Sequence, residues 1–506
     1  MLRPRSILFY CTFVVLSAFA AFAQTITKGP YLAMPEKDAV TIRWESDAAA
    51  DFRVKYGPTK SMNMSLPGTF VASSNDKRLY QARIERVQEG TTFYYQVVSP
   101  NSSSSIATFG TVASGKPVAF VVLGDSRTKP AVFGAIAEQV NRLQPNVILN
   151  VGDLVGSGGN YDEWQRYYFD VAADVINHIP LVPALGDHEG EDDDGRLFTH
   201  FFFPQKDYKK LWFSFDVGDA HFVALDYRYP DSEEMRQWFE KDMASTPARW
   251  KFVYMHRPCY NFGGHRSNWG HGVWPELFSQ YKVDMVFAGH SHLYERFRPT
   301  RPLANPNAWP VTYVTTGGAG APLYEVVQDS ALACAKSVNH FVAINLDKDR
   351  LQLHTYLTDG TLLDSVSFRK TSDGYDRRYM ARIIPQEELD LYGLFAGQIS
   401  QDLERLPMKK RPAIINLTLS LPTVNEDVDF RIMLTDSAAA SYRMAPVTGT
   451  IRVGQTVSMP LKIYAKKNMR VSRWGDIEPE IRLIAIYKSG SFHGRVLSKP
   501  LSYRDY

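Results

Sequence analysis

The alternation of hydrophobic and polar residues divides the chain into regions of two kinds. Between residues 24 and 115, short alternating runs occur at residues 40–44, 52–56 and 92–98. A period of two is typical of strands with one buried face, and turn residues such as Gly57-Pro58 separate the runs. We therefore predict an antiparallel β-sandwich over residues 24–115.

The pattern changes after Pro117, where continuous apolar runs replace the alternation. Such runs are typical of strands that are buried on both faces of a parallel sheet. They occupy residues 118–123, 146–151, 181–185, 222–225, 252–255, 283–288 and 311–316. Helical periodicity separates several of them, at residues 132–143, 162–176 and 232–243. This order of strands and helices predicts a layered α/β domain over residues 116–370.

The last part of the chain returns to alternation after a helical stretch. Residues 385–406 place apolar side chains on one side of a helix, so we predict a helical linker over residues 371–410. Alternating runs then continue from Pro412 towards the end, which predicts a second β-sandwich over residues 411–506. The predicted fold class is therefore multidomain, with an α/β domain flanked by N-terminal and C-terminal β-sandwiches.

The first residues have the pattern of a secretory signal peptide. Arg3 and Arg5 precede an apolar run over residues 7–22, and Ala21-Phe22-Ala23 forms an A-x-A cleavage site. A membrane anchor is the alternative, but a spanning helix needs about 20 apolar residues. We predict a signal peptide over residues 1–23 and a secreted or periplasmic protein with no transmembrane segment in the mature chain. Export permits a disulfide between Cys259 and Cys334, and the sequence leaves open whether they meet.

Composition narrows the classes of partner. The 57 Lys and Arg residues nearly balance 54 Asp and Glu residues, for a net charge of +3. That balance argues against nucleic acid or an anionic membrane as the main partner. With 44% hydrophobic and 22% charged residues, the chain is not mainly disordered.

Acids and imidazoles follow five of the apolar runs. They are Asp125, Asp153, Asp187, His256, His290 and His292. Carboxylates gathered at one edge of a sheet repel each other, and burying them without compensation costs several kcal/mol per ion unless cations are present. Mixed oxygen and nitrogen ligands suit zinc, manganese or iron. Six ligands are too many for one tetrahedral zinc, so we predict two metal ions that share a bridging carboxylate.

The motifs that carry these residues resemble a known family. They are Gly124-Asp125, Gly152-Asp153, Gly186-Asp187-His188-Glu189, Met255-His256-Arg257-Pro258 and Gly289-His290-Ser291-His292. This order is similar to that of the calcineurin-like metallophosphoesterases, which have a four-layer α/β sandwich. GHSHLYERF and MHRPCYN resemble the purple acid phosphatase branch, and VKYGPT resembles its leading fibronectin type III-like domain. The resemblance covers roughly residues 25–370.

The resemblance implies an activity and a role for each ligand. The implied activity is metal-dependent, acid phosphatase-like hydrolysis of phosphate esters, chiefly small phosphomonoesters, by a metal-bound hydroxide. Asp125 and His292 are expected to bind the first metal, Asp153 to bridge, and Asp187, His256 and His290 to bind the second. His188 is expected to be an acid or hydrogen-bond donor in the phosphate pocket. His265 matches a substrate-binding histidine, although an ordinary loop histidine is the alternative.

Three positions depart from the family pattern. Arg127 stands where many members have a histidine, Gly156 where purple acid phosphatases have a metal-binding tyrosine, and Asp187 where the usual residue is asparagine. We therefore predict no tyrosinate charge-transfer band. Our hypothesis is that Arg127 offsets the charge of Asp187 and contacts the substrate; the alternative is a surface arginine paired with the acidic loop.

Two other functions stay open at this point. The substrate could be a phosphodiester, because the walls of the pocket lie in loops that the sequence does not define. Alternatively, the α/β domain could be degenerate and the protein could be a non-catalytic surface binding protein. The sequence gives no role for the C-terminal sandwich, no metal identity and no oligomeric state.

Overall fold

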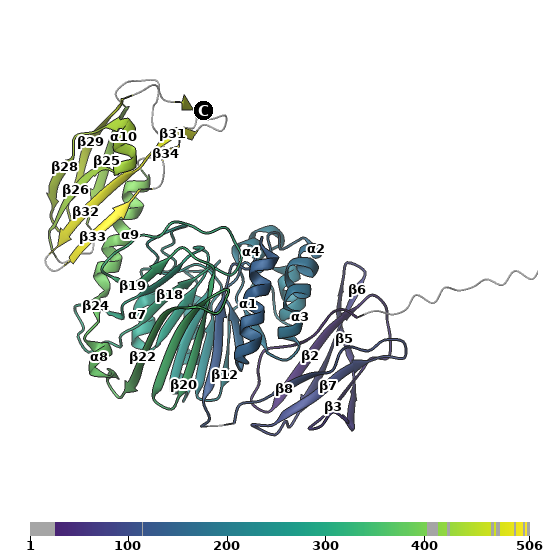
Figure 1. Cartoon of the computed structure of the whole chain (residues 1–506). Coiled ribbons are helices and arrows are strands. Elements are labelled where there is room, and N and C mark those ends of the chain that lie inside the picture. Colours follow the sequence, from purple (N-terminus) through teal and green to yellow (C-terminus); the bar gives the residue numbers. More distant parts are fainter. Residues whose placement is uncertain are drawn as a thin grey trace, which may run out of the picture.

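A computed structural model describes residues 26–113, 115–401, 413–421, 426–466, 470–471, 476–489, 492–498 and 501–502. The predicted signal peptide and part of the predicted helical linker lie outside these residues. Figure 1 shows N-terminal sheets, a central α/β part and C-terminal sheets in succession. Among the described helices, none combines the length and apolar character needed to cross a membrane.

The N-terminal part consists of two four-stranded antiparallel sheets. One has the order β1 (Ile26–Leu32), β2 (Ala39–Ser46), β6 (Lys77–Glu85) and β5 (Thr69–Ser74). The other has the order β4 (Met64–Pro67), β3 (Arg53–Gly57), β7 (Thr92–Val98) and β8 (Ala107–Gly110). Alternate residues of β7 are buried, including Tyr95 and Val97, and Trp44 stacks on Tyr80 in the same core. The alternating runs predicted at residues 40–44, 52–56 and 92–98 correspond to β2, β3 and β7.

The central part contains two seven-stranded sheets among the described residues. The first has the order β11 (Leu181–Pro183), β10 (Val147–Asn150), β9 (Val118–Leu123), β20 (His340–Asp347), β21 (Arg350–Leu357), β22 (Leu362–Thr371) and β23 (Gly374–Tyr375). The second has the order β12 (Phe213–Val217), β13 (Ala220–Ala224), β14 (Trp250–Met255), β15 (Met285–Ala288), β18 (Thr312–Thr316), β16 (Tyr294–Phe297) and β19 (Leu332–Lys336). The ring of Phe120 in β9 lies 5.0 Å from Phe222 and 4.8 Å from Phe252, so β9 packs across the core against β13 and β14.

Helices follow the parallel strands, as the α/β pattern predicted. They are α1 (Pro130–Leu143), α2 (Tyr161–Glu163), α3 (Asp170–Ile176), α4 (Asp187–Asp193), α5 (Arg196–Phe202), α6 (Glu233–Ser245) and α7 (Trp274–Gln280). A π-helical turn, η1 (Trp164–Phe169), interrupts the helix predicted over residues 162–176. Its Tyr168 stacks on Phe133 of α1, so the turn belongs to the core.

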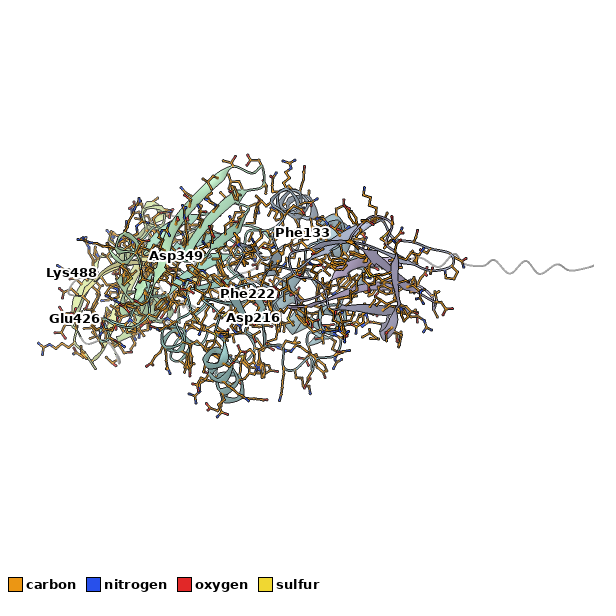
Figure 2. All side chains as sticks on the ribbon, turned by 90° about the horizontal axis from the view of Figure 1, so that it is seen from below. Phe133, Asp216, Phe222, Asp349, Glu426 and Lys488 are labelled. Carbon is orange, nitrogen blue, oxygen red and sulfur yellow. The ribbon has the colours of Figure 1, made fainter. Side chains whose placement is uncertain are left out.

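The C-terminal part is a helix packed on further sheets. After α8 (Arg377–Met380), the helix α9 (Gln386–Gln401) leads to the sheets β25-β29-β27, β28-β26-β32-β33 and β30-β31-β34. Their strands are β25 (Ala413–Ser420), β26 (Val428–Leu434), β27 (Tyr442–Arg443), β28 (Val447–Ile451), β29 (Thr456–Ala465), β30 (Arg470–Val471), β31 (Asp476–Ile481), β32 (Leu483–Ser489), β33 (Phe492–Leu497) and β34 (Leu501–Ser502). The remaining short elements are β17 (Thr300–Arg301), β24 (Ile384–Pro385) and α10 (Asp436–Ser441). In Figure 2, Phe133 and Phe222 lie in the central part, whereas Glu426 and Lys488 mark the C-terminal sheets.

Candidate metal centre

The six predicted ligands come from the carboxyl ends of strands in both central sheets. Asp125 follows β9, Asp153 follows β10, and Asp187 begins α4 after β11. His256 follows β14, while His290 and His292 follow β15. Parallel strands point their carboxyl ends to one edge, so the first sheet presents the acids and the second presents the imidazoles. The sequence predicted the strand ends but not this division between two sheets.

Three of these residues hold a left-handed backbone conformation. The φ angles are 57° at Asp125, 55° at Asp153 and 66° at His290. Such angles cost non-glycine residues on the order of 1–3 kcal/mol and are enriched at functional sites. The His290 N–H donates to Asp125 Oδ2 over 3.1 Å, which helps to hold one of these turns.

Glu189 holds the turn at Asp153, and the sequence analysis gave it no role. Its carboxylate accepts hydrogen bonds from the backbone N–H groups of Asp153, Leu154, Val155 and Gly186, over 2.8–3.1 Å. The side chain is fully buried. Burial and the charge of Asp153 raise the pKa of Glu189, whereas the hydrogen bonds from these N–H groups favour the ionised carboxylate and lower it.

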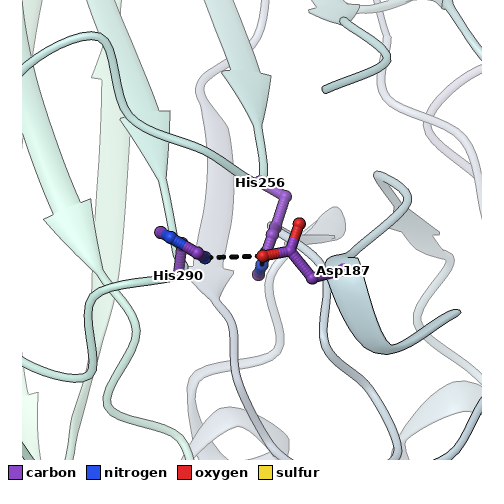
Figure 3. Close-up of side chains that lie close together, drawn as sticks. All are labelled: Asp187, His256 and His290. Atoms are coloured by element: carbon purple, nitrogen blue, oxygen red, sulfur yellow. Dashed lines mark ion pairs between the residues drawn. The ribbon is translucent and has the colours of Figure 1, made fainter. Parts of the chain in front are cut away.

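One group of ligand atoms converges on Asp187. His290 Nδ1 lies 2.8 Å from Asp187 Oδ2, and His256 Nε2 lies 3.7 Å from the same oxygen. Figure 3 shows the three side chains pointing toward one another, with the ion pair between His290 and Asp187 marked. One ligand atom from each residue lies within 4.8 Å of the others, a spacing that suits a single ion.

A second group shares His256 with the first. It consists of Asp125, Asp153 and His256, again with ligand atoms within 4.8 Å of one another. Asp153 Oδ1 lies 3.3 Å from His256 Nε2, and Asp125 Oδ1 lies 3.3 Å from His292 Nε2. These two overlapping groups of acids and imidazoles are therefore candidates to hold metal ions.

The imidazole tautomers fit metal binding. His256 Nδ1 lies 2.9 Å from the carbonyl oxygen of Val151, and His292 Nδ1 lies 2.7 Å from that of Pro322. Each ring therefore donates its Nδ1–H to the backbone, so Nε2 is the nitrogen that faces the acids and is placed to bind a metal ion. His256 Nε2 is buried and has no hydrogen-bond partner among the described residues. A metal ion would satisfy this nitrogen.

The charges within the group demand a cation. Burial opposes ionisation of Asp153, but the charge of His256 holds its pKa below the ordinary value. Burial also opposes ionisation of Asp187, but the neighbouring imidazoles of His256 and His290 keep its pKa well below the usual range. Burial lowers the pKa of His256, whereas Asp153 and Asp187 raise it to about 10. The acids thus draw a proton onto His256, a positive charge that metal ions would replace.

A pocket of about 600 Å³ opens above these residues. Its lining includes all three residues that were predicted to meet substrate: Arg127, His188 and His265. His188 Nδ1 lies 2.5 Å from the Gly156 carbonyl oxygen, so its other nitrogen is turned toward Asp153. His265 stacks on His290 with ring centroids 4.5 Å apart.

Two arginines in the pocket lining each contact a different aspartate. Arg127 Nε lies 3.3 Å from Asp153 Oδ2, and its NH2 group lies 3.4 Å from His292 Nε2. The arginine in direct contact with Asp187 is Arg257, whose Nε lies 2.8 Å from Asp187 Oδ1. Arg257 also pairs with Glu191 over 2.9 Å. The sequence analysis overlooked Arg257, although it directly follows His256.

Other lining residues were also missed. Tyr324 lies with its ring parallel to that of His292, with centroids 4.4 Å apart, but no motif marked it in the sequence. Gly156 lies in the lining where a tyrosine would stand in purple acid phosphatases.

Cys259 and Cys334 are free thiols and do not form a disulfide.

The sequence matches the family described as calcineurin-like phosphoesterase over residues 118–294. An uncharacterised protein of Mycobacterium tuberculosis is 27% identical over 278 residues, which cover 45% of this chain and 52% of that protein. Purple acid phosphatase 21 of Arabidopsis thaliana is 26% identical, over 49% of this chain and 59% of its own. Phosphoenolpyruvate phosphatase of Allium cepa is 25% identical, over 48% and 57%. The chain therefore spans about half the length of the curated relatives it matches.

Two solved structures share the fold. Purple acid phosphatase PPD1 from yellow lupin has a TM-score of 0.59 at 18% identity, over 70% of this chain and 76% of its own. PhoD has a TM-score of 0.54 at 10% identity, over 69% of this chain and 90% of its own. The region that matches the calcineurin-like phosphoesterase family, residues 118–294, thus lies within a fold that this chain shares with a purple acid phosphatase and with PhoD. The relatives of the chain include purple acid phosphatases, and its own ligand-bearing strands lie within the matched region.

Proposed function

We propose that the protein is an exported, dinuclear-metal phosphoesterase that hydrolyses phosphomonoesters. The observation that carries the proposal is the pair of overlapping ligand groups, which meet at the unpartnered Nε2 of His256 beneath the pocket. One relative is named phosphoenolpyruvate phosphatase, and that named substrate is a phosphomonoester. The predicted signal peptide supports export.

Six residues would hold the metals in this proposal: Asp125, Asp153, Asp187, His256, His290 and His292. Bound metal ions of this type polarise phosphoryl oxygens and lower the pKa of water to about 7. Zinc, manganese and iron all suit the mixed carboxylate and imidazole donors. Gly156 contributes no phenolate oxygen, so we still expect no tyrosinate charge-transfer band.

The chain's own residues would handle the phosphate and the leaving group. Arg127 and Arg257 give the pocket two guanidinium groups, which are suited to phosphate oxygens. His188 is oriented by the Gly156 carbonyl oxygen, so its Nε2 is available to protonate a leaving alkoxide, a role that contributes about 10²–10⁴-fold. His265 borders the same space and would position the ester group.

The test combines metal analysis with turnover of two esters. The mature chain, residues 24–506, is reconstituted with zinc, manganese or iron and assayed with p-nitrophenyl phosphate and bis-p-nitrophenyl phosphate. We expect two metals per chain and faster turnover of the monoester. Asp153→Asn should lose metal and more than about 100-fold of the activity, because Asp153 is one of the six proposed metal ligands. Asp359→Asn, in an exposed turn, is the matched control.

Other results would point to the other functions. Faster turnover of the diester would make the protein a phosphodiesterase with the same site. If the chain binds no metal and turns over neither ester, the proposal is overturned and a binding protein is favoured. N-terminal sequencing of protein released from an expressing cell checks export, with Gln24 as the expected first residue.

A further inference from the structure

The pocket wall that carries His265 has no regular secondary structure of its own. Residues 259–267 run between β14 and α7, and His265 at the edge of the pocket stacks on His290. The amide of Asn261 donates to the carbonyl oxygens of Gly263 and His265, over 2.8 and 3.2 Å. Such local bonds shape the segment but do not fix it against the rest of the domain. Its position must come from what it packs against.

From the domain side, a buried carboxylate holds the segment. Glu295 in β16 is fully buried and accepts the N–H groups of Phe262 (3.0 Å) and Gly263 (2.7 Å). Ser291, between two proposed metal ligands, donates its hydroxyl to the Gly263 carbonyl oxygen over 3.0 Å. The segment is therefore tied directly to the strand that follows the metal-binding motif.

From the opposite side, helix α9 covers the segment. The ring of Tyr392 stacks on Phe262 with centroids 3.5 Å apart and an angle of 14° between the planes. Its hydroxyl donates to the Phe262 carbonyl oxygen over 3.1 Å, and Tyr260 donates to Asp390 over 2.8 Å. All three aromatic side chains are buried. Helix α9 lies beyond the region that matches the phosphoesterase family, which ends at residue 294.

Helix α9 is in turn fixed to the C-terminal sheets. Phe395 stacks on Tyr487 of β32 at 5.0 Å, and Gln398 exchanges hydrogen bonds with the backbone of Ser420 in β25, over 3.0 and 3.1 Å. A second contact connects the C-terminal part of the chain to the pocket wall: Arg482 pairs with Glu325 over 2.7 Å. The Glu325 carbonyl oxygen accepts the N–H of Gly264 over 3.0 Å, beside His265.

We propose that the C-terminal part of the chain positions the substrate wall of the pocket, and that Tyr392 is the positioning residue through which it holds His265. The proposal rests on the proposed function, because it assigns the C-terminal part a role in the same site. Tyr392 does not line the pocket, so its effect on substrate must pass through the segment that carries His265. Metal binding should not depend on Tyr392.

The test is a double-mutant cycle between Tyr392 and His265. Tyr392→Leu removes both the stacking and the hydrogen bond, and Tyr392→Phe removes only the hydrogen bond. With p-nitrophenyl phosphate, we expect Tyr392→Leu to lower kcat/KM by about 10–100-fold, since small misplacements of a site residue have effects of this size. Tyr392→Phe should lose less, and metal content should stay at two per chain. Tyr464→Leu, an exposed tyrosine in β29, is the control.

The cycle separates positioning from general damage. In a His265→Ala background, neither change at Tyr392 should lower kcat/KM further, because the group that it positions is gone. An equal loss in both backgrounds, or no loss in either, would overturn the proposal. If Tyr392→Leu does not fold, the Tyr392→Phe arm decides alone.

A second measurement does not depend on turnover. Hydrogen–deuterium exchange over residues 259–267 should accelerate in Tyr392→Leu, while exchange in β9 and β10 stays as in the parent chain. Unchanged exchange in the segment would overturn the proposal even if the protein is an active phosphatase. Faster exchange in a protein without metal or turnover would support the positioning and reject the proposed function.

Discussion

At the scale of single residues, Glu189 is the residue on which the turn at Asp153 depends. Its carboxylate accepts four backbone N–H groups, one of them from Asp153 itself. Glutamine at this position would replace one acceptor oxygen by a donor facing those N–H groups. Glu189→Gln should therefore weaken zinc binding by about 10–100-fold, the usual effect of changing a residue that orients a ligand.

Competition with a chromophoric chelator measures this affinity. Glu138→Gln is the control, because Glu138 is an exposed glutamate of α1 that pairs with Arg142 outside the pocket. Equal zinc affinity in the two variants would show that the four hydrogen bonds do not orient Asp153.

Arg257 and Asp187 form an ion pair beside the proposed metal site. The guanidinium group lies 2.8 Å from a carboxylate that stands where the family usually has asparagine. Without Arg257 the site gains one uncompensated negative charge, whose repulsion of a phosphate dianion is roughly 4 kcal/mol at about 8 Å in an effective dielectric of about 20, an upper bound that solvent and ions in the open pocket reduce. We therefore expect Arg257→Ala to raise KM for p-nitrophenyl phosphate by about tenfold.

The partner substitution tests whether charge is the cause. Asp187→Asn in the Arg257→Ala background removes the same negative charge, so it should bring KM part of the way back. If KM instead rises further, Arg257 acts by direct contact with phosphate and not by compensating Asp187. Steady-state kinetics at constant ionic strength measure both changes.

At the scale of elements, His221 links two strands and a helix through charge. It lies on β13, buried between Asp216 of β12 (2.7 Å) and Asp242 of α6 (2.8 Å). Burial lowers the pKa of His221, but the hydrogen bonds that its ring donates to the two acids raise it to about 9. A pKa above the unfolded value of about 6.5 stabilises the fold fully below pH 6.5, and the stabilisation is lost as the pH rises toward 9.

His221→Gln should remove this pH dependence. We expect the parent chain to lose on the order of 2 kcal/mol of unfolding free energy between pH 6.5 and 9 through this group, and the variant to lose none of that part. Thermal unfolding across the pH range measures the difference between the two chains, with His354→Gln as a control for removing an imidazole. A constant difference at all pH values would show that His221 stays neutral.

The elements also show why part of the structure was predictable. Strands β9, β10 and β14 are apolar because both of their faces are buried, so their ends, and hence Asp125, Asp153 and His256, could be located in the sequence. Tyr324 and Glu295 could not, because their importance lies in contacts across 30 or more residues: Tyr324 with His292, and Glu295 with Phe262. Neither the periodicity nor the spacing of residues along the sequence predicts contacts between residues so far apart.

At the scale of the whole molecule, the N-terminal sheets meet the central part at a buried ion pair. Lys28 Nζ of β1 lies 2.8 Å from Glu45 Oε1 of β2, and neither side chain is exposed. Across the interface, the Tyr161 hydroxyl donates to Glu45, and Lys28 Nζ lies 3.5 Å from the centre of the Tyr161 ring. The acid thus joins the two parts of the chain.

Because Lys28 and Glu45 are buried, removing one charge should destabilise the fold more than removing both. Lys28→Met leaves Glu45 without its lysine, and the remaining basic group near it is His200 Nε2 at 3.9 Å, so the change should cost about 3–5 kcal/mol of unfolding free energy. Lys28→Met combined with Glu45→Leu removes both charges and should recover most of that loss, since apolar packing replaces a buried pair at little net cost. Thermal unfolding and limited proteolysis between residues 110 and 118 measure the docking of the N-terminal sheets. Lys210→Met, which breaks the exposed pair with Glu234, should leave both readouts unchanged. A double variant as unstable as Lys28→Met would mean that the ion pair itself, and not merely the absence of an unpaired charge, holds the two parts together.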